Sequence, residues 1–421
     1  MVRIGIIGLG GFAADHWHHL DEVQRHGACR IVATAVIDPE NHSARLEQLR
    51  SEGVKVFTSP MEMFDAMRGQ MDAVTIPTSI HSHAELMIAA VQSGYHVFLE
   101  TPPAATIQEV DEMIAATKRS GKLCAVGFQA IWSASMSFLK MRIGEGALGQ
   151  VQQIACSAGL IRKQDYYDRN RWAGRLRLDE AWVLDGSANN ALAHEIANML
   201  YLASPERRKL ARPLAVRGEL YRGHDIESED TAAIEIFTAE GPRCYFLATQ
   251  CADDTLDPEI TVIASEGTAY RHHGGRVCIR YNDGRLEQPT MDDPRQFVER
   301  FENFCSAVAA NDVDILRCHL EMVRPFTLAV NGAFESSRQV HAIPADYLRI
   351  SGTGATRKTV IDGIDAAIPE AASRGELFSD LGQPWAHPTA TFDLTGYSQF
   401  PQQFQPGQPA PQIIPGGLPL G

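Results

Sequence analysis

The feature that most constrains the fold is a glycine-rich turn placed directly after the first hydrophobic run of the chain. Val2–Ile7 is a short apolar segment, followed by Gly8-Leu9-Gly10-Gly11-Phe12-Ala13 and then by helical spacing to about Gln24. Glycines allow a tight turn and a close approach of the backbone to a ligand. A helix N-terminus adds free N–H groups and a positive dipole end. This strand–turn–helix context predicts an anion-binding turn in a parallel α/β domain.

Strands and helices continue to alternate through the next hundred residues. β-prone runs are expected at Arg30–Ile37, Ala73–Ile76, Val97–Leu99 and Leu123–Phe128, with helical spacing at His83–Ser93 and Thr106–Ser120. This alternation predicts a doubly wound parallel sheet, the Rossmann fold, over residues 1–128. The turn formed by Gly8, Gly10, Gly11, Phe12 and Ala13 then becomes a binding site for a dinucleotide pyrophosphate.

An acidic residue, Asp38, ends the second expected strand. A carboxylate at this position can accept hydrogen bonds from the adenosine ribose hydroxyls, and it would repel a 2′-phosphate. No arginine follows it directly. The sequence therefore favours NAD over NADP as the cofactor.

The pattern changes from about Gly149 onward. Short β-prone runs separated by turns lie at Val151–Ser157, Leu214–Tyr221, Ala232–Thr238, Arg243–Thr249, Glu259–Ala264 and Arg276–Tyr281. They predict a second α/β domain, over residues 129–345, with a large and mostly antiparallel open sheet. We expect one inserted helix at 190–202, and a second with an apolar stripe from Phe297 to Val308. A third, at 316–340, is expected to return toward the first domain.

Residues 346–421 form a C-terminal extension that is rich in Pro, Gln and Gly from about residue 384. Six prolines fall between Pro401 and Pro419. Such a segment buries too little apolar surface to fold alone, so it is expected to be disordered or to lie as an arm on a neighbouring subunit. Several apolar side chains would let an arm dock: Phe392, Tyr397, Phe400, Phe404, Ile413 and Ile414.

Charge and composition exclude several classes of partner. The formal net charge of −14 disfavours nucleic acid and anionic membranes. Eight scattered cysteines form no C-x-x-C pair, and no apolar run is long enough to span a membrane. The histidines at 16, 18 and 19 do not share one helix face and have no further ligand placed beside them. We therefore expect a cytoplasmic protein with reduced thiols and without a metal.

Three ordered motifs carry a resemblance to a known family. They are Thr78-Ser-Ile-His-Ser-His83 with Gly94-Tyr-His-Val-Phe-Leu-Glu100-Thr-Pro102, Val126-Gly-Phe-Gln129, and Gly146-Ala-Leu-Gly149. Over about residues 1–340 the chain resembles the glucose–fructose oxidoreductase/inositol dehydrogenase (Gfo/Idh/MocA) family. The resemblance implies a substrate on one face of the open sheet, and a homodimer or homotetramer. It also implies further cofactor-binding residues: Thr78, His83, Glu100, Pro102 and Gln129.

The chain departs from this family at the residue that matters most for proton transfer. The family's lysine, which positions the reacting hydroxyl, is Thr101 here, and threonine supplies no cation or acid–base group near neutral pH. A further motif of the family ends in Asp-x-x-x-His on a helix, where this chain has Asn190 and His194. Residues at i and i+4 share a helix face, so these two side chains are expected to point into one cleft.

A loop rich in aromatic and polar residues follows in the second domain. Tyr167, Arg169, Asn170 and Trp172 suit a polyol, because aromatic faces contact ring C–H groups and polar groups bind hydroxyls. Lys163 is the nearest lysine in sequence that could replace the missing one, and we include it among the candidate substrate contacts. The alternative is a loop packed on the sheet or at a subunit contact.

The resemblance implies an NAD-dependent oxidoreductase that transfers hydride to or from a carbinol carbon of a sugar, sugar derivative or cyclitol. His194 would be the general acid–base, Asn190 would orient a hydroxyl, and Thr101 would hold a water or hydroxyl. One alternative is an NAD-recycling enzyme that cleaves glycosides by oxidation, elimination and reduction. Another is a catalytically inactive dinucleotide-binding sensor or scaffold.

Overall fold

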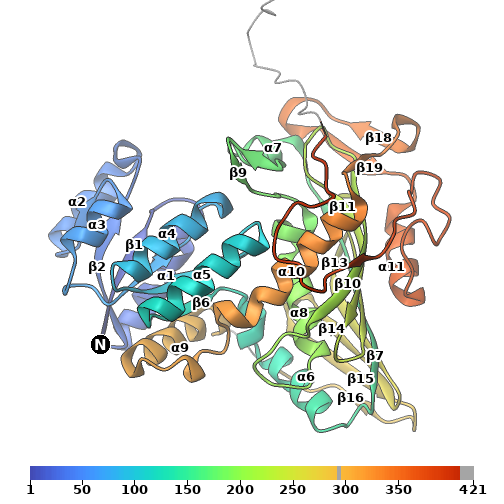
Figure 1. Ribbon diagram of the computed structural model, residues 1–421, viewed down its shortest axis with the longest axis horizontal. Coiled ribbons are helices and arrows are strands. Elements are labelled where there is room, and N and C mark those ends of the chain that lie inside the picture. The colour runs from blue at the N-terminus through green and yellow to red at the C-terminus, as the bar shows by residue number, and fades with distance from the viewer. Residues whose placement is uncertain (292–294, 408–421) are drawn as a thin grey trace, which may run out of the picture.

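The N-terminal sheet contains six parallel strands, in a computed structural model that describes residues 1–291 and 295–407 (Figure 1). Its order is β3-β2-β1-β4-β5-β6. The strands are β1 (Val2–Ile7), β2 (Cys29–Ala35), β3 (Lys55–Phe57), β4 (Ala73–Ile76), β5 (His96–Leu99) and β6 (Cys124–Val126). The helices are α1 (Phe12–Arg25), α2 (Ser43–Ser51), α3 (Pro60–Ala66), α4 (Ile80–Gln92) and α5 (Ile107–Ser120). The predicted Rossmann fold is confirmed.

The strand order decides where a ligand can bind on this domain. The order reverses between β1 and β4, which pair directly in parallel. In open α/β sheets, ligands bind outside the carboxyl ends of the strands at this reversal. Here the residues that follow β1, β4 and β5 are Gly8, Thr78 and Glu100. The predicted motifs therefore lie at one edge of the sheet, although they are far apart in sequence.

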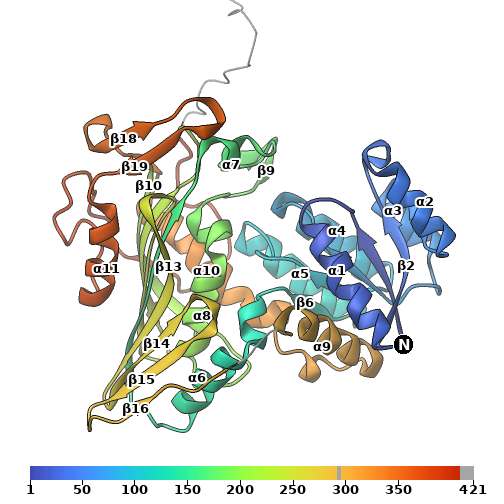
Figure 2. The same ribbon diagram turned by 180° about the vertical axis from the view of Figure 1, so that it is seen from behind.

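The second domain is built on a mixed, mostly antiparallel sheet, as expected. Its order is β16-β15-β14-β13-β7-β12-β11-β10-β17, and β20 (Phe392–Asp393) also pairs with β10. The strands are β7 (Val151–Ile161), β10 (Pro213–Arg222), β11 (Thr231–Thr238), β12 (Arg243–Thr249), β13 (Cys251–Ala264), β14 (Gly267–His272), β15 (Val277–Tyr281), β16 (Leu286–Glu287) and β17 (His341–Ala342). The β7–β12 and β10–β17 pairs are parallel. The helices α6 (Ala134–Gly144) and α8 (Ala193–Ala203) lie on the side of the sheet nearer the Rossmann domain (Figures 1 and 2).

Helix α9 (Gln296–Ala310) packs on the Rossmann domain, although its sequence lies within the expected second domain (Figure 2). Phe301 and Phe304 contact Phe98 of β5, with ring centroids 4.6 and 5.6 Å apart. The following helix, α10 (Leu320–Ser337), was also expected to return toward the first domain, and it does contact α5 and β6 there. Its Asn331 side chain accepts from the Ile107 N–H at 2.8 Å and donates to the Ala105 carbonyl at 2.9 Å.

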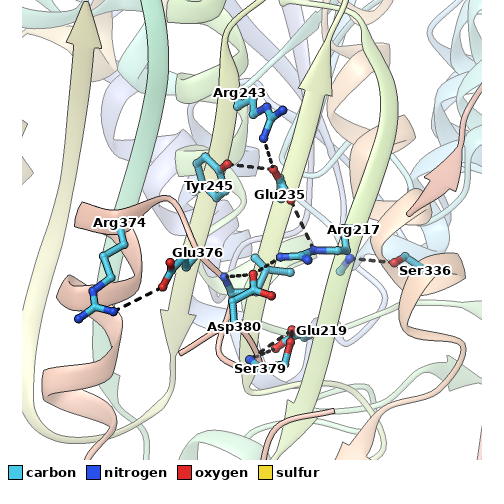
Figure 3. A network of polar contacts seen from close by, with 12 residues as sticks. Arg217, Glu219, Glu235, Arg243, Tyr245, Ser336, Arg374, Glu376, Ser379 and Asp380 are labelled. Carbon is cyan, nitrogen blue, oxygen red and sulfur yellow. Dashed lines mark hydrogen bonds and ion pairs between the residues drawn. The ribbon is translucent and has the colours of Figure 1, made fainter. Parts of the chain in front are cut away.

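The first part of the C-terminal extension covers the outer face of the large sheet, opposite α8 and α10 (Figure 1). It contains the hairpin β18 (Leu348–Ser351) and β19 (Lys358–Ile361), followed by α11 (Ile364–Arg374). Apolar side chains of α11 and the next segment bury Tyr221, Leu247 and other sheet residues. Figure 3 shows the polar contacts at this face, where Glu219 accepts from the Ser379 N–H at 3.2 Å and Arg217 forms an ion pair with Asp380.

The proline-containing segment up to residue 407 lies on its own chain, which corrects the expectation of a disordered tail or an arm on a neighbour. Phe400 and Phe404 contact Trp182, with centroids 5.0 and 6.3 Å away, and both contact Phe334 of α10. On the Rossmann side, the Gln108 side chain pairs with both backbone groups of Phe400, at 2.7 and 3.0 Å. Ile413 and Ile414 lie outside the described residues. We call residues 392–404 the strap.

A single buried carboxylate fixes the strap. Glu335, near the C-terminal end of α10, has no exposed surface. It accepts from the Tyr397 hydroxyl at 2.7 Å and from the backbone N–H groups of Gln402, Gln403 and Phe404 at 2.6–2.8 Å. A negative charge is unfavourable both in the core and beside the C-terminus of a helix. Four donors from the strap offset that cost, so the strap and Glu335 depend on each other.

Replacing Glu335 with Gln is expected to free the strap. The amide would present a donor to N–H groups that require an acceptor, and charge-assisted hydrogen bonds contribute about 1.5–3 kcal/mol each. We expect a lower urea midpoint and faster amide hydrogen exchange at residues 402–404. Glu321→Gln is the matched control on the same helix, since that side chain is 59% exposed and forms a surface ion pair with Lys118. Equal behaviour of the two variants would contradict this role of Glu335.

Candidate functional site

The turn after β1 has the geometry of an anion-binding loop. Gly8 and Gly11 have positive φ angles of 92° and 55°, which disfavour any other residue. A Cβ at Gly11 would meet nothing within 4 Å, so the space beside the turn is open. Within the described chain, no backbone carbonyl accepts from the Gly10, Gly11 or Phe12 N–H groups at the start of α1. The turn therefore fits a pyrophosphate, with Ala13 supporting it behind Gly8.

Asp38 lies at the carboxyl end of the second strand with half of its side chain exposed. Asn41 donates to its carboxylate at 3.3 Å, and His42 Nε2 lies 3.8 Å away. Ile37, immediately before it, is 81% exposed, and Phe12 is 53% exposed. We expected Phe12 at this site and missed Ile37. Large exposed apolar residues beside a carboxylate that is expected to bind the ribose suit the adenine ring. The signal in the sequence was an isoleucine at the end of a strand, directly before Asp38.

His83 joins two of the predicted motifs instead of facing a ligand. Its ring nitrogens lie 2.9 Å from the Pro102 carbonyl oxygen and 3.0 Å from the Thr78 carbonyl oxygen. Burial lowers the pKa of this imidazole. His83 therefore holds the turn after β4 against the turn after β5. Gln129 begins a short helical turn, η2 (Gln129–Trp132), after β6 at the same edge of the sheet.

Glu100 is the centre of a buried charge cluster. Its carboxylate accepts from His16 Nε2 at 2.7 Å, from Arg300 Nη1 at 3.1 Å and from the Thr101 N–H at 3.2 Å. Burial alone would raise the pKa of Glu100, but His16 and Arg300 outweigh it and lower that pKa. The ionised Glu100 therefore fixes the backbone of Thr101. Sequence reasoning missed Arg300, because α9 brings it back from two hundred residues away.

Thr101 and His194 meet across the two domains. Thr101 Oγ1 lies 3.3 Å from His194 Nε2, which belongs to the first turn of α8. The imidazole ring packs edge-on against Phe128, with centroids 5.5 Å apart. Its buried Nδ1 has no hydrogen-bond partner among the described residues. Burial lowers the pKa of His194 to about 4, so the ring is neutral at neutral pH.

Asn190 is not on the same α-helix as His194, which corrects the predicted helix over 190–202. It lies in a π-helical turn, Ser187–Ala191, and Leu192 then leaves helical geometry before α8 begins at Ala193. Single π-helical turns often mark functional sites. The Asn190 side chain donates to Asp185 Oδ1 at 2.5 Å. The i, i+4 argument therefore does not describe how these two residues are related.

Two buried acids that the sequence analysis missed support this turn. Asp185 also accepts from the Gly174 N–H at 2.7 Å and from Arg169 at 3.4 Å, and burial raises its pKa. Glu229 accepts from the Ala188 N–H at 2.9 Å and the Ser228 hydroxyl at 2.7 Å, and burial raises its pKa to about 7. Their sequence spacing shows no periodicity, so only the fold could identify them.

The expected polyol loop divides into buried and exposed members. Tyr167 is buried, donates to Gln250 at 3.2 Å and packs on His224. The Asn170 side chain accepts from the backbone N–H groups of Trp172 and Ala173. Arg169 and Lys163 are exposed and Trp172 is half-buried. Lys163 lies beside the β18–β19 hairpin, where its backbone bridges to Lys358.

One buried group of side chains has the composition of a metal site. His224, Asp230 and Cys251 place their ligand atoms within 4.8 Å of one another. The Asp230 carboxylate already accepts from the His224 ring at 2.9 Å, from the Gly223 and His224 N–H groups and from the Thr231 hydroxyl. Because these bonds use its lone pairs, the cluster is complete without an ion.

No helix within residues 1–291 and 295–407 is long and apolar enough to cross a membrane.

Known proteins resemble this chain in sequence and in fold. Inositol 2-dehydrogenase of Serratia proteamaculans is 28% identical over 48% of this chain and 54% of its own length. A second inositol 2-dehydrogenase, from Azotobacter vinelandii, is 24% identical over 75% of this chain and 83% of its own length. The chain thus matches only about half of the first of these relatives.

Solved structures share the fold at lower identity. The WlbA dehydrogenase of Bordetella pertussis, in complex with NADH and UDP-GlcNAcA, has a TM-score of 0.66 and 20% identity. A levoglucosan dehydrogenase in complex with NADH has a TM-score of 0.68 and 19% identity. Each alignment covers 80% of this chain and 96% of the other. Residues 2–128 match the oxidoreductase family with an NAD-binding Rossmann fold. Residues 2–128 of this chain therefore belong to the Gfo/Idh/MocA oxidoreductase family.

Proposed function

We propose that this protein is an NAD-dependent dehydrogenase acting on a carbinol carbon of a sugar, sugar derivative or cyclitol. The observation that carries the proposal is the 3.3 Å contact between Thr101 Oγ1 and His194 Nε2. It brings an acid–base side chain of the second domain to the edge of the sheet where the dinucleotide is expected. The relatives support the substrate class, since they include inositol dehydrogenases and a levoglucosan dehydrogenase. We also propose that the protein is cytoplasmic and forms a homodimer or a homotetramer.

The Gly8–Ala13 turn and Asp38 would hold the cofactor. Bound NAD supplies the hydride acceptor, and the protein must orient the substrate and handle one proton. Thr78, Pro102 and Gln129 would line the nicotinamide end, and His83 and Glu100 would keep the surrounding turns in place. Asp38 favours NAD because its carboxylate would repel a 2′-phosphate.

His194 would handle the proton in place of the lysine that this chain lacks. With its pKa lowered to about 4, the imidazole is neutral at neutral pH and can accept a proton from a substrate hydroxyl. Thr101 would hold that hydroxyl, or a water, against His194 Nε2. Asn190, fixed by Asp185, would orient a second hydroxyl.

His194→Ala is expected to reduce kcat at least 100-fold, because general acid–base catalysis contributes about 10²–10⁴-fold. NADH formation from NAD with a panel of sugars and cyclitols measures this, and calorimetry should show unchanged NAD affinity. His273→Ala, an exposed histidine of the second domain, is the control. Glycoside cleavage without net NADH would instead favour the recycling enzyme. NAD binding without turnover of any panel member would favour the sensor.

The pH dependence of kcat/KM should report the lowered pKa of the buried His194 imidazole. Above pH 4 the neutral imidazole predominates and can accept a proton, and below this pH it is already protonated. We expect kcat/KM to change little from pH 7 to 5 through this group, and to fall as pH drops through about 4. His273→Ala should keep this limb. A limb near 6.5, the ordinary value for histidine, would contradict the buried and neutral ring.

Asp38→Ala is expected to weaken NAD binding about 10-fold or more, because hydrogen bonds to a charged group contribute about 1.5–3 kcal/mol. NADP binding should not weaken, so the ratio of the NADP to the NAD dissociation constant should fall. Titration calorimetry with both cofactors measures the change. Asp65→Ala, an exposed aspartate of α3 that pairs with Arg68, is the control. An unchanged NAD affinity would exclude Asp38 from the ribose site.

A further inference from the structure

A short segment of the second domain is strongly basic in a chain that is otherwise acidic. Residues 162–177 contain six Lys or Arg and two Asp, while the whole chain has a formal net charge of −14. The segment includes α7 (Gln164–Asp168). Figures 1 and 2 both show α7 at the edge of the second domain that faces the Rossmann domain. Nothing in the proposed hydride transfer requires this charge.

Two guanidinium groups of this segment pack against one aromatic ring. The Cζ atoms of Arg162 and Arg169 lie 4.3 and 3.8 Å from the centroid of the Tyr166 ring. Burial raises the pKa of Tyr166, and both arginines act against that rise. Stacking restrains a guanidinium while it leaves edge N–H groups free to donate. Tyr166 therefore holds two oriented cationic donors.

These charges are poorly neutralised within the described residues. Arg162 forms no ion pair there, and its buried Nε has no acceptor. Arg169 reaches a carboxylate only at 3.4 Å, and another of its nitrogens donates to the Tyr166 carbonyl. Buried polar groups are normally satisfied, so an orphaned guanidinium nitrogen indicates a missing acceptor. The acceptor that matches two forked donors is a carboxylate or phosphate oxyanion.

Contacts through Asp185 connect Arg169 to Asn190, which lies four residues before His194 of the proposed reaction centre. Asp185 accepts from Arg169 through one oxygen and from Asn190 through the other. Asn190 precedes His194, whose Nε2 lies beside Thr101. The Asp185 carboxylate thus lies between the guanidinium group of Arg169 and Asn190, the residue that would orient a substrate hydroxyl.

We propose that Arg162 and Arg169 form a subsite for an anionic group on the substrate. The substrate would then be a sugar or cyclitol that carries a carboxylate or a phosphate. Its carbinol would lie at Thr101 and His194, and its oxyanion would reach the guanidinium groups around Tyr166. This inference rests on the proposed function, because it places the reacting carbon at His194.

The test compares ligands that differ by one charged group, with the protein saturated with NADH. Glucose, glucuronate and glucose 6-phosphate are titrated by calorimetry, and the same compounds are assayed for turnover with NAD. We expect at least one anionic member to bind about 10-fold or more tightly than glucose. The preference should weaken as salt is raised, because salt screens charge. Whether the carboxylate or the phosphate binds better identifies the kind of anion.

Arg162→Gln and Arg169→Gln should each remove most of this preference. Arg162→Gln should leave glucose affinity unchanged, whereas Arg169 also bonds to the carboxylate that fixes Asn190 and so is not used to judge neutral binding. The Lys substitutions at the same positions retain the charge and should restore part of it, which a purely structural role would not predict. Arg171→Gln is the matched control, since that side chain lies in the same loop and is 81% exposed. Thermal midpoints and NADH affinity show whether each variant is folded.

The outcomes separate this inference from the proposed function. Binding of an anionic ligand that depends on both arginines, without any turnover, would support the subsite and overturn the dehydrogenase. Turnover of neutral and anionic members at equal KM would support the dehydrogenase and overturn the subsite. An equal loss of the preference for anionic ligands in Arg171→Gln would also overturn the subsite. The preference would then come from the net positive charge of the loop and not from Arg162 and Arg169.

Discussion

The buried ion pair between Glu100 and Arg300 is the interaction on which the rest of the site depends. Glu100 follows β5 and bonds to the backbone of Thr101, and Arg300 comes from α9 and also reaches Asp15 of α1. One charge pair thus fixes the turn that carries Thr101 and attaches α9 to the nucleotide-binding helix. Buried charges are tolerated only when they are paired and hydrogen-bonded. The cluster therefore specifies one arrangement of segments that are distant in sequence.

A second buried carboxylate has the same role in the other domain. Asp185 connects the loop at Arg169 and Gly174 with the π-helical turn at Asn190. Trp182, three residues earlier, packs under Phe400 and Phe404 of the strap, and the strap reaches Gln108 of the Rossmann domain. The proposed substrate residues are therefore held from two directions, by Asp185 within their own domain and by the strap between the domains.

A threonine at position 101, where the resemblance implies a lysine, changes the expected electrostatics of the candidate site more than its shape. His83 and Glu100 still hold the turns around Thr101, as their contacts with Pro102 and with the Thr101 backbone show. A lysine at 101 would place a cation beside His194, whereas Thr101 leaves the imidazole as the only titratable side chain in that contact. In the proposed subsite, the positive charge lies farther away, at the guanidinium groups around Tyr166.

The sequence by itself determined the Rossmann domain, the glycine turn after its first strand and the place of Asp38 after its second strand. It also determined that the family motifs follow strands of this sheet, because all these features depend on local propensities and short spacings. It also predicted the mixed character of the second sheet. Only the tertiary structure decided that α9 returns to the first domain, that the strap binds Glu335 of its own chain, and that Asn190 lies in a π-helical turn. It alone identified Arg300, Asp185 and Glu229 as supports of the site. These features come from contacts between residues far apart in sequence, and no periodicity within one segment encodes which distant partner will satisfy a buried charge.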